Sequence, residues 1–154
     1  YILMHMKGDP KTMQQQASYS DVTLEVIDYF AQRVGQLLEL GVHDIILDPG
    51  FGFSKTTAQN YELLAQLGSL VDAFTQPLLV GVSRKSMIYR PLGITPEEAL
   101  NGTTVLHALA LERGAKILRV HDVRPAVEAV QLYEELRPAL RSGEGLHYQH
   151  LRPL

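Results

Sequence analysis

The sequence predicts an α/β fold in which four parallel β-strands alternate with helices. Four short segments are continuously apolar rather than alternating, as is typical of strands covered on both faces; they are residues 1–6, 44–48, 77–83 and 115–123. Longer segments between them carry apolar residues at the helical period. A strand and a helix repeating every 30–40 residues, roughly, is typical of βαβ units. Their right-handed crossovers place all strand carboxyl ends on one side.

Apolar stripes and end signals place the helices. Residues 21–41 carry a stripe of Val, Ile, Phe and Leu, and Gly41 is placed to end that helix. The same period continues through residues 60–74. A helix over residues 95–113 is predicted from a capping-box start, with Thr95 as the cap, Pro96 in the first helical position and Glu98 as the capping carboxylate. A last helix is predicted over residues 125–136.

Two architectures fit these four units. A closed barrel of eight βα units needs about 250 residues, so this chain corresponds to about half of one. An open, doubly wound sheet is the alternative, and in both folds ligands bind beyond the carboxyl ends of the strands. The chain begins directly with an apolar strand at Tyr1, which suggests a segment from the middle of a longer protein. Residues 139–154 are expected to form a polar, poorly ordered tail.

Composition and charge argue against several classes of protein. The chain is 45% hydrophobic and 20% charged with a formal net charge of −3, so it lacks the basic footprint of a nucleic-acid-binding protein. Its apolar runs are far shorter than the roughly 20 residues that cross a bilayer. The absence of cysteine fits a reducing compartment. We therefore expect a cytoplasmic protein that binds neither nucleic acid nor membrane.

Polar and charged residues gather where each predicted strand ends. The four ends carry Met4-His5-Met6-Lys7-Gly8, Asp48-Pro49-Gly50-Phe51-Gly52-Phe53, Gly81-Val82-Ser83-Arg84-Lys85-Ser86 and Arg119-Val120-His121-Asp122. Most have an ordinary structural explanation: Met4 and Met6 as core residues, Asp48 as a turn residue, Arg84 and Lys85 as a solvated pair, and Asp122 as a helix cap. For Asp122 the cap is the favoured interpretation, whereas Asp48 is equally well explained as a turn or a site residue.

Arg119 is harder to explain structurally because it lies within an apolar strand. A period of two puts Arg119 and His121 on one face and Val120 on the other. Two cationic groups on one face suit phosphate, and a guanidinium can also stack on a flat ring. Asp48 can accept two hydrogen bonds from an amidine-like edge, and a helix starting near Ser86 can receive a carboxylate. Together these ends predict a flat, nitrogen-rich heterocycle bearing phosphate, with a second anionic reactant nearby.

Four motifs resemble those of dihydropteroate synthase in order and spacing. They are "LMHMKGDPKTMQ", "DPGFGFSKT", "GVSRKS" and "RVHDV", and the resemblance runs from Tyr1 to about Pro138. That family, the target of sulfonamides, joins 6-hydroxymethyl-7,8-dihydropterin pyrophosphate to p-aminobenzoate in folate biosynthesis and releases pyrophosphate. Its fold is a TIM barrel. The resemblance therefore implies that residues 1–138 are the carboxyl-terminal half of a pterin-binding barrel.

The resemblance also implies a role for each candidate residue. The pterin would contact Asp48, Lys85, Arg119, Met4, Phe53 and Gly81; pyrophosphate would be bound by Arg119 and His121, and p-aminobenzoate by Ser86 and Lys85. Lys85, Arg119 and His121 would be the catalytic residues. They would act through electrostatics and positioning, without a covalent nucleophile.

The other half of such a barrel would hold the remaining parts of the site. The family's first-strand Asn, which helps to bind Mg²⁺, has no counterpart here, so Mg²⁺ is expected as a cofactor without a protein ligand in this chain. A homodimer is also implied. Two alternatives stay open. One is another pterin-binding barrel, of the methyltetrahydrofolate methyltransferase type, which has no need of the Arg119 and His121 pair. The other is an inactive fragment that only binds pterin.

Overall fold

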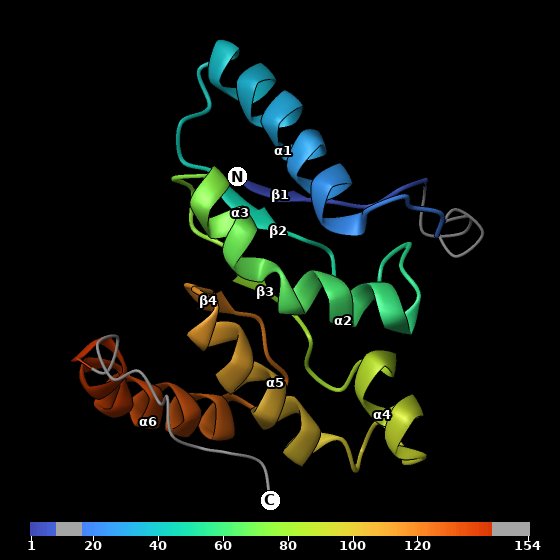
Figure 1. The fold of residues 1–154 in the computed structure, drawn as a ribbon, viewed down its shortest axis with the longest axis vertical. Coiled ribbons are helices and arrows are strands. Elements are labelled where there is room, and N and C mark those ends of the chain that lie inside the picture. The colour runs from blue at the N-terminus through green and yellow to red at the C-terminus, as the bar shows by residue number, and fades with distance from the viewer. Residues whose placement is uncertain (9–16, 143–154) are drawn as a thin grey trace, which may run out of the picture.

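Strands and helices alternate along the computed structural model, which describes residues 1–8 and 17–142 (Figure 1). In chain order the elements are β1 (Ile2–Met4), α1 (Val22–Glu39), β2 (Ile46–Asp48), α2 (Thr57–Ala65), α3 (Leu67–Ala73), β3 (Leu79–Val80), α4 (Ser86–Leu92), α5 (Leu100–Glu112), β4 (Ile117–Leu118) and α6 (Val123–Ser142). Each predicted strand is present but shorter than its apolar run. The predicted α/β class is confirmed.

The four strands are parallel and adjoin one another in chain order. β1 pairs with β2 in a register that sets Met4 opposite Asp48, and β3 pairs with β4. An isolated bridge between Leu47 and Leu78 joins the two pairs. This sequential order is that of a barrel wall, because a doubly wound sheet reverses its order at a switch point. The described strands form part of such a wall and do not close a barrel.

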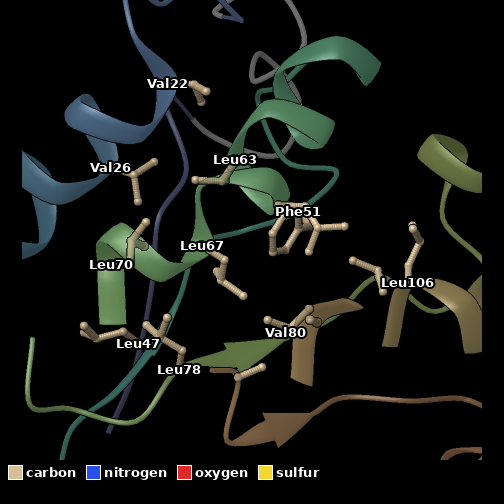
Figure 2. Packing of buried hydrophobic residues seen from close by; sticks show 14 of the residues in the cluster. Val22, Val26, Leu47, Phe51, Leu63, Leu67, Leu70, Leu78, Val80 and Leu106 are labelled. Atoms are coloured by element: carbon tan, nitrogen blue, oxygen red, sulfur yellow. The ribbon is translucent and has the colours of Figure 1, made fainter. Parts of the chain in front are cut away.

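Helices α1, α2 and α3 share one hydrophobic core with the strands (Figure 2). Its fully buried side chains include Val22, Val26, Phe30, Leu47, Phe51, Leu63, Leu67, Leu70, Leu78 and Val80. Burying each side chain of this size contributes about 1.5–3 kcal/mol. The core therefore fixes the strands firmly and, with them, the loops that leave their carboxyl ends.

Both ends of α1 are capped, and Gly41 follows its end as predicted. The side chain of Asp21 accepts a 2.9 Å hydrogen bond from the N–H of Leu24 at the amino end. At the other end Gly41 has a φ of +82°, a left-handed conformation that glycine adopts without a Cβ penalty. This turn lets the N–H of Val42 reach the carbonyl of Leu37 and leads the chain into β2.

The prediction of a single helix over residues 60–74 was wrong, because two helices occupy this segment. A capping box between Thr56 and Gln59 starts α2 earlier, and the chain turns at Gln66 before α3 begins. Leu63 and Leu67, on either side of the turn, are both fully buried. The apolar pattern continues across the break, so periodicity alone did not reveal it.

The helix predicted from Thr95 starts later. Residues 95–99 form turns closed by hydrogen bonds from one residue to the third before it, and α5 begins at Leu100. Glu98 still accepts the N–H of Thr95 at 2.9 Å, as the predicted capping box requires. The carbonyls of the two residues after Thr95 accept hydrogen bonds from the guanidinium of Arg84. These bonds hold the segment in turns in place of a regular helical start.

α6 extends beyond the predicted helix, residues 125–136, at both ends. It starts at Val123 and continues through Pro138 to Ser142. Its apolar stripe continues past the proline to Leu140, which lies against the same hollow as the middle of the helix. The first four residues of the predicted tail are therefore helical, and the rest lie outside the described residues. Neither α6 nor any other helix in the described part of the chain is long and apolar enough to cross a membrane.

Candidate functional site

Parallel pairing brings the carboxyl ends of the four strands to one side of the sheet. Asp48 is the last residue of β2, and the loops after β3 and β4 begin next to it. The charges of Lys85 and Arg119 act on the carboxylate of Asp48, and both side chains approach Gly81. We refer to Asp48, Phe53, Gly81, Lys85, Arg119 and His121 as the strand-end site.

Asp48 is a buried carboxylate held at the end of its strand. It is 7% exposed, and its Oδ1 accepts a 2.9 Å hydrogen bond from the N–H of Gly50. Burial raises the pKa of Asp48, while that hydrogen bond and the nearby cations Lys85, Arg119 and Lys55 lower it. The two explanations that the sequence left open are therefore combined. One oxygen closes a turn, and the carboxylate as a whole stands among three cations.

Two glycines let the loop after β2 fold closely against its neighbours. Gly50 has a φ of +71°, and a Cβ there would lie 2.0 Å from the carbonyl oxygen of His5. Gly52 has a φ of +81°, and a Cβ there would lie 3.1 Å from the side chain of Lys85. Any other residue at position 50 would push the loop away from β1. These glycines are therefore what allows the loop to reach both β1 and Lys85.

The two phenylalanines of this loop have opposite surroundings. Phe51 is fully buried in the core (Figure 2), whereas Phe53 is half-buried. The Nζ of Lys85 lies 4.7 Å from the centroid of the Phe53 ring. A cation over an aromatic face is attracted by the negative face of the ring. Phe51 thus anchors the loop, and Phe53 presents a flat ring beside the lysine of the strand-end site.

Lys85 connects the loop after β3 with the loop after β2. Its Nζ donates a hydrogen bond to the carbonyl of Phe51 and lies near Gly81. Burial lowers the pKa of Lys85, Asp48 raises it, and Arg119 lowers it further. A partly desolvated ammonium therefore stands next to the buried carboxylate, where it can donate to a carbonyl oxygen of a ligand.

Arg119 and His121 follow β4 and are exposed together. A Cβ on Gly81 would lie 3.7 Å from the Cβ of Arg119. The Nδ1 of His121 lies 3.0 Å from the Oγ of Ser83, which also accepts the N–H of His121 at 3.2 Å. Val120 instead lines a hollow beside α6, so the alternation predicted from a period of two is confirmed. Two exposed groups of this kind beside one loop suit an anion.

Arg84 and Asp122 form an ion pair that ties the loops after β3 and β4 together. The guanidinium donates two hydrogen bonds to the carboxylate, at 2.8 and 2.9 Å. The pair lowers the pKa of Asp122 and raises the pKa of Arg84. Asp122 does precede α6, and its carbonyl accepts the N–H of Ala126. Its carboxylate nevertheless binds Arg84, so a simple helix cap and a solvated Arg84–Lys85 pair were incomplete descriptions.

Met4 and Ser86 flank the strand-end site. Met4 is half-buried at the end of β1, directly opposite Asp48 in the sheet register. Ser86 is half-buried and is the first residue of α4, one position after Lys85. Met4 thus lies next to Asp48, and Ser86 next to Lys85, which are the residues that the resemblance groups them with.

Lys55 and Asn60 are two residues near the site that sequence reasoning missed. Lys55 is 3% exposed, and its ammonium contacts His5 and two carbonyls of the loop after β2. The side chain of Asn60 accepts the N–H of Gly52 at 2.7 Å. The sequence shows a lysine inside a glycine-rich loop, immediately before the capping box of α2, but nothing that marks this lysine as buried.

A metal site is not formed by the residues that the structure describes. Within residues 1–8 and 17–142 there is no group of three or more His, Cys, Asp or Glu side chains that could hold a metal ion. A hollow of about 870 Å³ lies between α5, β4 and α6, and its lining includes the apolar side chains Leu118, Val120, Val127 and Val130. This hollow contains no residue of the strand-end site. The Mg²⁺ expected from the resemblance stays a prediction.

Relatives of known activity match most of the chain. The family model described as "Pterin binding enzyme" matches residues 1–121. Dihydropteroate synthase of Escherichia coli strain K12 is 46% identical over 134 residues, which are 86% of this chain and 47% of that protein. The enzyme of Neisseria meningitidis serogroup C is 44% identical over 137 residues, 87% of this chain and 48% of that protein. The chain thus spans about half the length of the curated relatives it matches.

A solved structure shows the same arrangement of elements. Dihydropteroate synthase from Thermus thermophilus matches with a TM-score of 0.84 and 39% identity over 88% of this chain and 55% of that one. That enzyme has also been solved in complex with 6HMPPP and with 4-aminobenzoate. The fold, the four motifs and the family match agree, and the chain belongs to the family of pterin-binding enzymes that includes dihydropteroate synthase.

Proposed function

We propose that this chain forms the pterin-binding half of a dihydropteroate synthase site. The whole enzyme would join 6-hydroxymethyl-7,8-dihydropterin pyrophosphate to p-aminobenzoate, giving 7,8-dihydropteroate and pyrophosphate. One observation carries the proposal: the buried carboxylate of Asp48 lies at the strand ends among the side chains of Lys85 and Arg119, with His121 in the same loop as Arg119. The complexes of the Thermus thermophilus relative with 6HMPPP and with 4-aminobenzoate support it.

In this proposal Asp48 fixes the orientation of the pterin. Its carboxylate is already held by the N–H of Gly50, so it can accept hydrogen bonds from the 2-amino and N3 edge without rearranging. Lys85 would donate to the ring carbonyl. The ring would lie in a pocket lined by Met4, Phe53, Gly81 and Arg119. A rigid acceptor of this kind decides which way round the heterocycle binds.

Arg119 and His121 would hold the pyrophosphate. In the reaction the C–O bond to pyrophosphate breaks and its electron pair leaves with that group, so a stabilised pterin-methyl cation remains. The amine of p-aminobenzoate attacks this carbon, a C–N bond forms, and the nitrogen loses a proton. Cations placed at the leaving group stabilise the charge that develops there. Ser83 holds the Nδ1 side of His121, which leaves its Nε2 for the phosphate.

Lys85 and Ser86 would bind the carboxylate of p-aminobenzoate. They are consecutive residues at the start of α4, and the side chain of Lys85 would also lie against the pterin ring beside Gly81. One lysine between the two substrates would bring the amine and the reacting carbon into line. Positioning of two reactants in this way accounts for much of the rate of a bimolecular reaction.

Mg²⁺ would add charge neutralisation at the pyrophosphate in the whole enzyme. The described residues of this chain do not fit a Mg²⁺ site made of protein ligands, because no suitable group of three or more side chains exists among them. Every step assigned above therefore uses only side chains of this chain.

The first test is a titration of the chain with 6-hydroxymethyl-7,8-dihydropterin pyrophosphate and with the bare 6-hydroxymethyl-7,8-dihydropterin. Tighter binding of the pyrophosphate ester supports the proposal. Equal binding of both ligands points to a pterin-binding barrel of the methyltetrahydrofolate methyltransferase type, which has no pyrophosphate to hold. Binding of neither ligand contradicts the proposal.

The second test measures p-aminobenzoate-dependent release of pyrophosphate. The chain is refolded together with the amino-terminal half of the Escherichia coli relative, and Lys85→Ala is the control. Release that disappears in the control supports a synthase site. Binding without release in the mixture identifies a fragment that only binds pterin.

A further inference from the structure

Lys55 is a buried cation to which the proposed function assigns no role. It lies between the loop after β2 and the start of α2 and is 3% exposed. Its Nζ lies 3.0 Å from the Nδ1 of His5, 3.1 Å from the carbonyl oxygen of Gly50 and 3.2 Å from that of Phe53. An ammonium has three donors and no acceptor. Each of its hydrogens therefore has one partner, and each partner must be an acceptor.

When Lys55 is protonated, this geometry sets the tautomer of His5. An Nδ1 that accepts from an ammonium carries no hydrogen, so the neutral ring has its hydrogen on Nε2. The ring is itself held, because Tyr29 meets it edge-on with centroids 5.0 Å apart. The N–H of His5 also donates to the carbonyl of Asp48 at 2.9 Å. The position of Lys55 is thus coupled to the junction of β1 and β2.

The two loop carbonyls bound by Lys55 belong to the turn that follows Asp48 and carries Phe53. The carbonyl of Gly50 also accepts the N–H of Phe53 at 3.1 Å, and the N–H of Gly50 donates to Asp48. Lys55 therefore holds both ends of the segment from Gly50 to Phe53. One end fixes the carboxylate of Asp48, and the other fixes the ring that faces the ammonium of Lys85.

We propose that Lys55 is a positioning residue of the strand-end site, whose ammonium draws His5, Gly50 and Phe53 together and so fixes Asp48 and Phe53 for a ligand. The identity of that ligand rests on the proposed function. The effect of the ammonium on the loop does not, so the two can fail separately.

The surroundings of Lys55 set the pH range of this role, because the ammonium is present at and below about neutral pH. Burial lowers the pKa of Lys55 to about 7, Asp48 raises it, and Lys85 and Lys7 lower it. Burial and the two lysines at positions 55 and 7 lower the pKa of His5 to about 3, so its ring is neutral at neutral pH and able to accept. The remaining groups acting on the pair are the carboxylate of Glu25 and the ring of Tyr19.

The test must separate the ammonium from the packing of the side chain. The chain has no cysteine, so Lys55→Cys introduces a single thiol. Alkylation of the unfolded variant with 2-bromoethylamine restores a lysine-like ammonium, and alkylation with 1-bromopropane gives a neutral chain of the same length. Both products are refolded. Lys116→Cys, at an exposed position outside the strand-end site, receives the same treatments as the control.

The readout that needs no ligand is hydrogen exchange of the Phe53 amide, followed by NMR. We expect the aminoethyl form to match the unmodified protein and the propyl form to exchange roughly tenfold faster or more, since hydrogen bonds from a charged donor are worth at least that factor. Equal exchange in the two forms would overturn the proposal. The control should show no difference between its alkylated forms.

The second readout is the affinity for 6-hydroxymethyl-7,8-dihydropterin pyrophosphate. We expect it to fall by roughly tenfold in the propyl form and to be restored in the aminoethyl form. If the unmodified chain does not bind this ligand, the proposed function fails, and the Phe53 exchange still decides the role of Lys55. If neither alkylated form refolds, the ring nitrogens of His5 in the unmodified protein decide it. A hydrogen on Nδ1 at about pH 6 would refute the contact, because the neutral ring must accept there.

Discussion

The two pairs of strands hold their loops in different ways. The β1–β2 end is tied by Lys55, a buried ammonium whose three contacts are all neutral acceptors. The β3–β4 end is tied by Arg84, whose guanidinium pairs with Asp122; their side chains are 23% and 24% exposed. The same guanidinium also binds two carbonyls that precede α5. The Lys55 contacts are therefore buried and include no carboxylate. The Arg84–Asp122 ion pair is partly exposed to solvent, and both of its charges are paired.

This difference has consequences for proton binding. A buried lysine changes its pKa readily, whereas an arginine stays charged at all ordinary pH values. The loop after β2, which follows Asp48, should therefore respond to pH near neutrality. The loops after β3 and β4, the second of which carries Arg119 and His121, should stay joined by the Arg84–Asp122 ion pair. The side of the strand-end site that holds Asp48 is therefore expected to be pH-sensitive, whereas the Arg84–Asp122 ion pair stays intact over the same range.

The largest expected effect is on stability as a function of pH. The pKa of Lys55 is lowered from 10.5 to about 7 in the folded protein, so between these values the unfolded chain binds the extra proton. Stability attributable to this group is full above 10.5 and is lost as the pH falls towards 7. Relative to Lys55→Met, the unfolding free energy of the unmodified protein should therefore rise by on the order of 3 kcal/mol between about pH 7 and pH 10. Urea unfolding across this range measures it.

The matched comparison is Arg84→Met. The pKa of Arg84 is raised, so it is protonated throughout the same range and its difference from the variant should stay flat. If the unfolding free energies of Lys55→Met and Arg84→Met, each taken relative to the unmodified protein, changed with pH in the same way, Lys55 and Arg84 would not differ as proposed. His5 adds a second window of the same sign, since its pKa falls from 6.5 to about 3, and stability should be lost as the pH drops through that window.

Asp48→Asn should weaken binding of both the bare pterin and its pyrophosphate ester by about 2–3 kcal/mol. The substitution removes a charged acceptor and sets an NH₂ group opposite donors, so partners are left unpaired in a buried site. Isothermal titration with both ligands measures the change. Retained affinity for the bare pterin would remove Asp48 from the site. Asp44→Asn, an exposed residue before β2, is the control.

Sequence reasoning found the strand ends because their signals are local. Asp48 closes an apolar run, and the alternation of Arg119, Val120 and His121 follows from the geometry of an extended chain. Gly41 likewise terminates a helix through its own backbone freedom. Each of these features depends on a few neighbouring residues, so one sequence was enough to predict it.

The features that sequence reasoning missed depend on contacts between distant residues. Arg84 reaches Asp122 and the turns before α5, and those contacts moved the start of a helix that had a clear capping box. Lys55 contacts His5 across fifty positions of sequence. Its neighbours give no hint that it is buried, because a lysine in a glycine-rich loop is ordinarily solvated.

Arg119→Ala should weaken mainly the proposed binding of pyrophosphate. We expect a loss of about 1–3 kcal/mol in binding of the pyrophosphate ester, because a charge-assisted pair with phosphate is lost, and a smaller loss for the bare pterin. Raising the salt concentration should shrink the difference, since Arg119 is exposed. An unchanged dissociation constant for the ester would refute its role as a pyrophosphate ligand.

The smallest effect is expected from Arg84→Lys. A lysine keeps the positive charge and, like arginine, has a Cβ at this φ of +52°, so the backbone cost is unchanged. Its ammonium cannot bind both carboxylate oxygens and two carbonyls together. Because the pair is partly solvated, we expect a loss of about 1 kcal/mol or less in unfolding free energy. Arg124→Lys is the control, since its partner Glu128 lies one turn along α6 in an exposed pair. If Arg84→Lys cost as much as Lys55→Met at high pH, the solvated tie would be as important to the fold as the buried one. The two strand pairs would then be held alike.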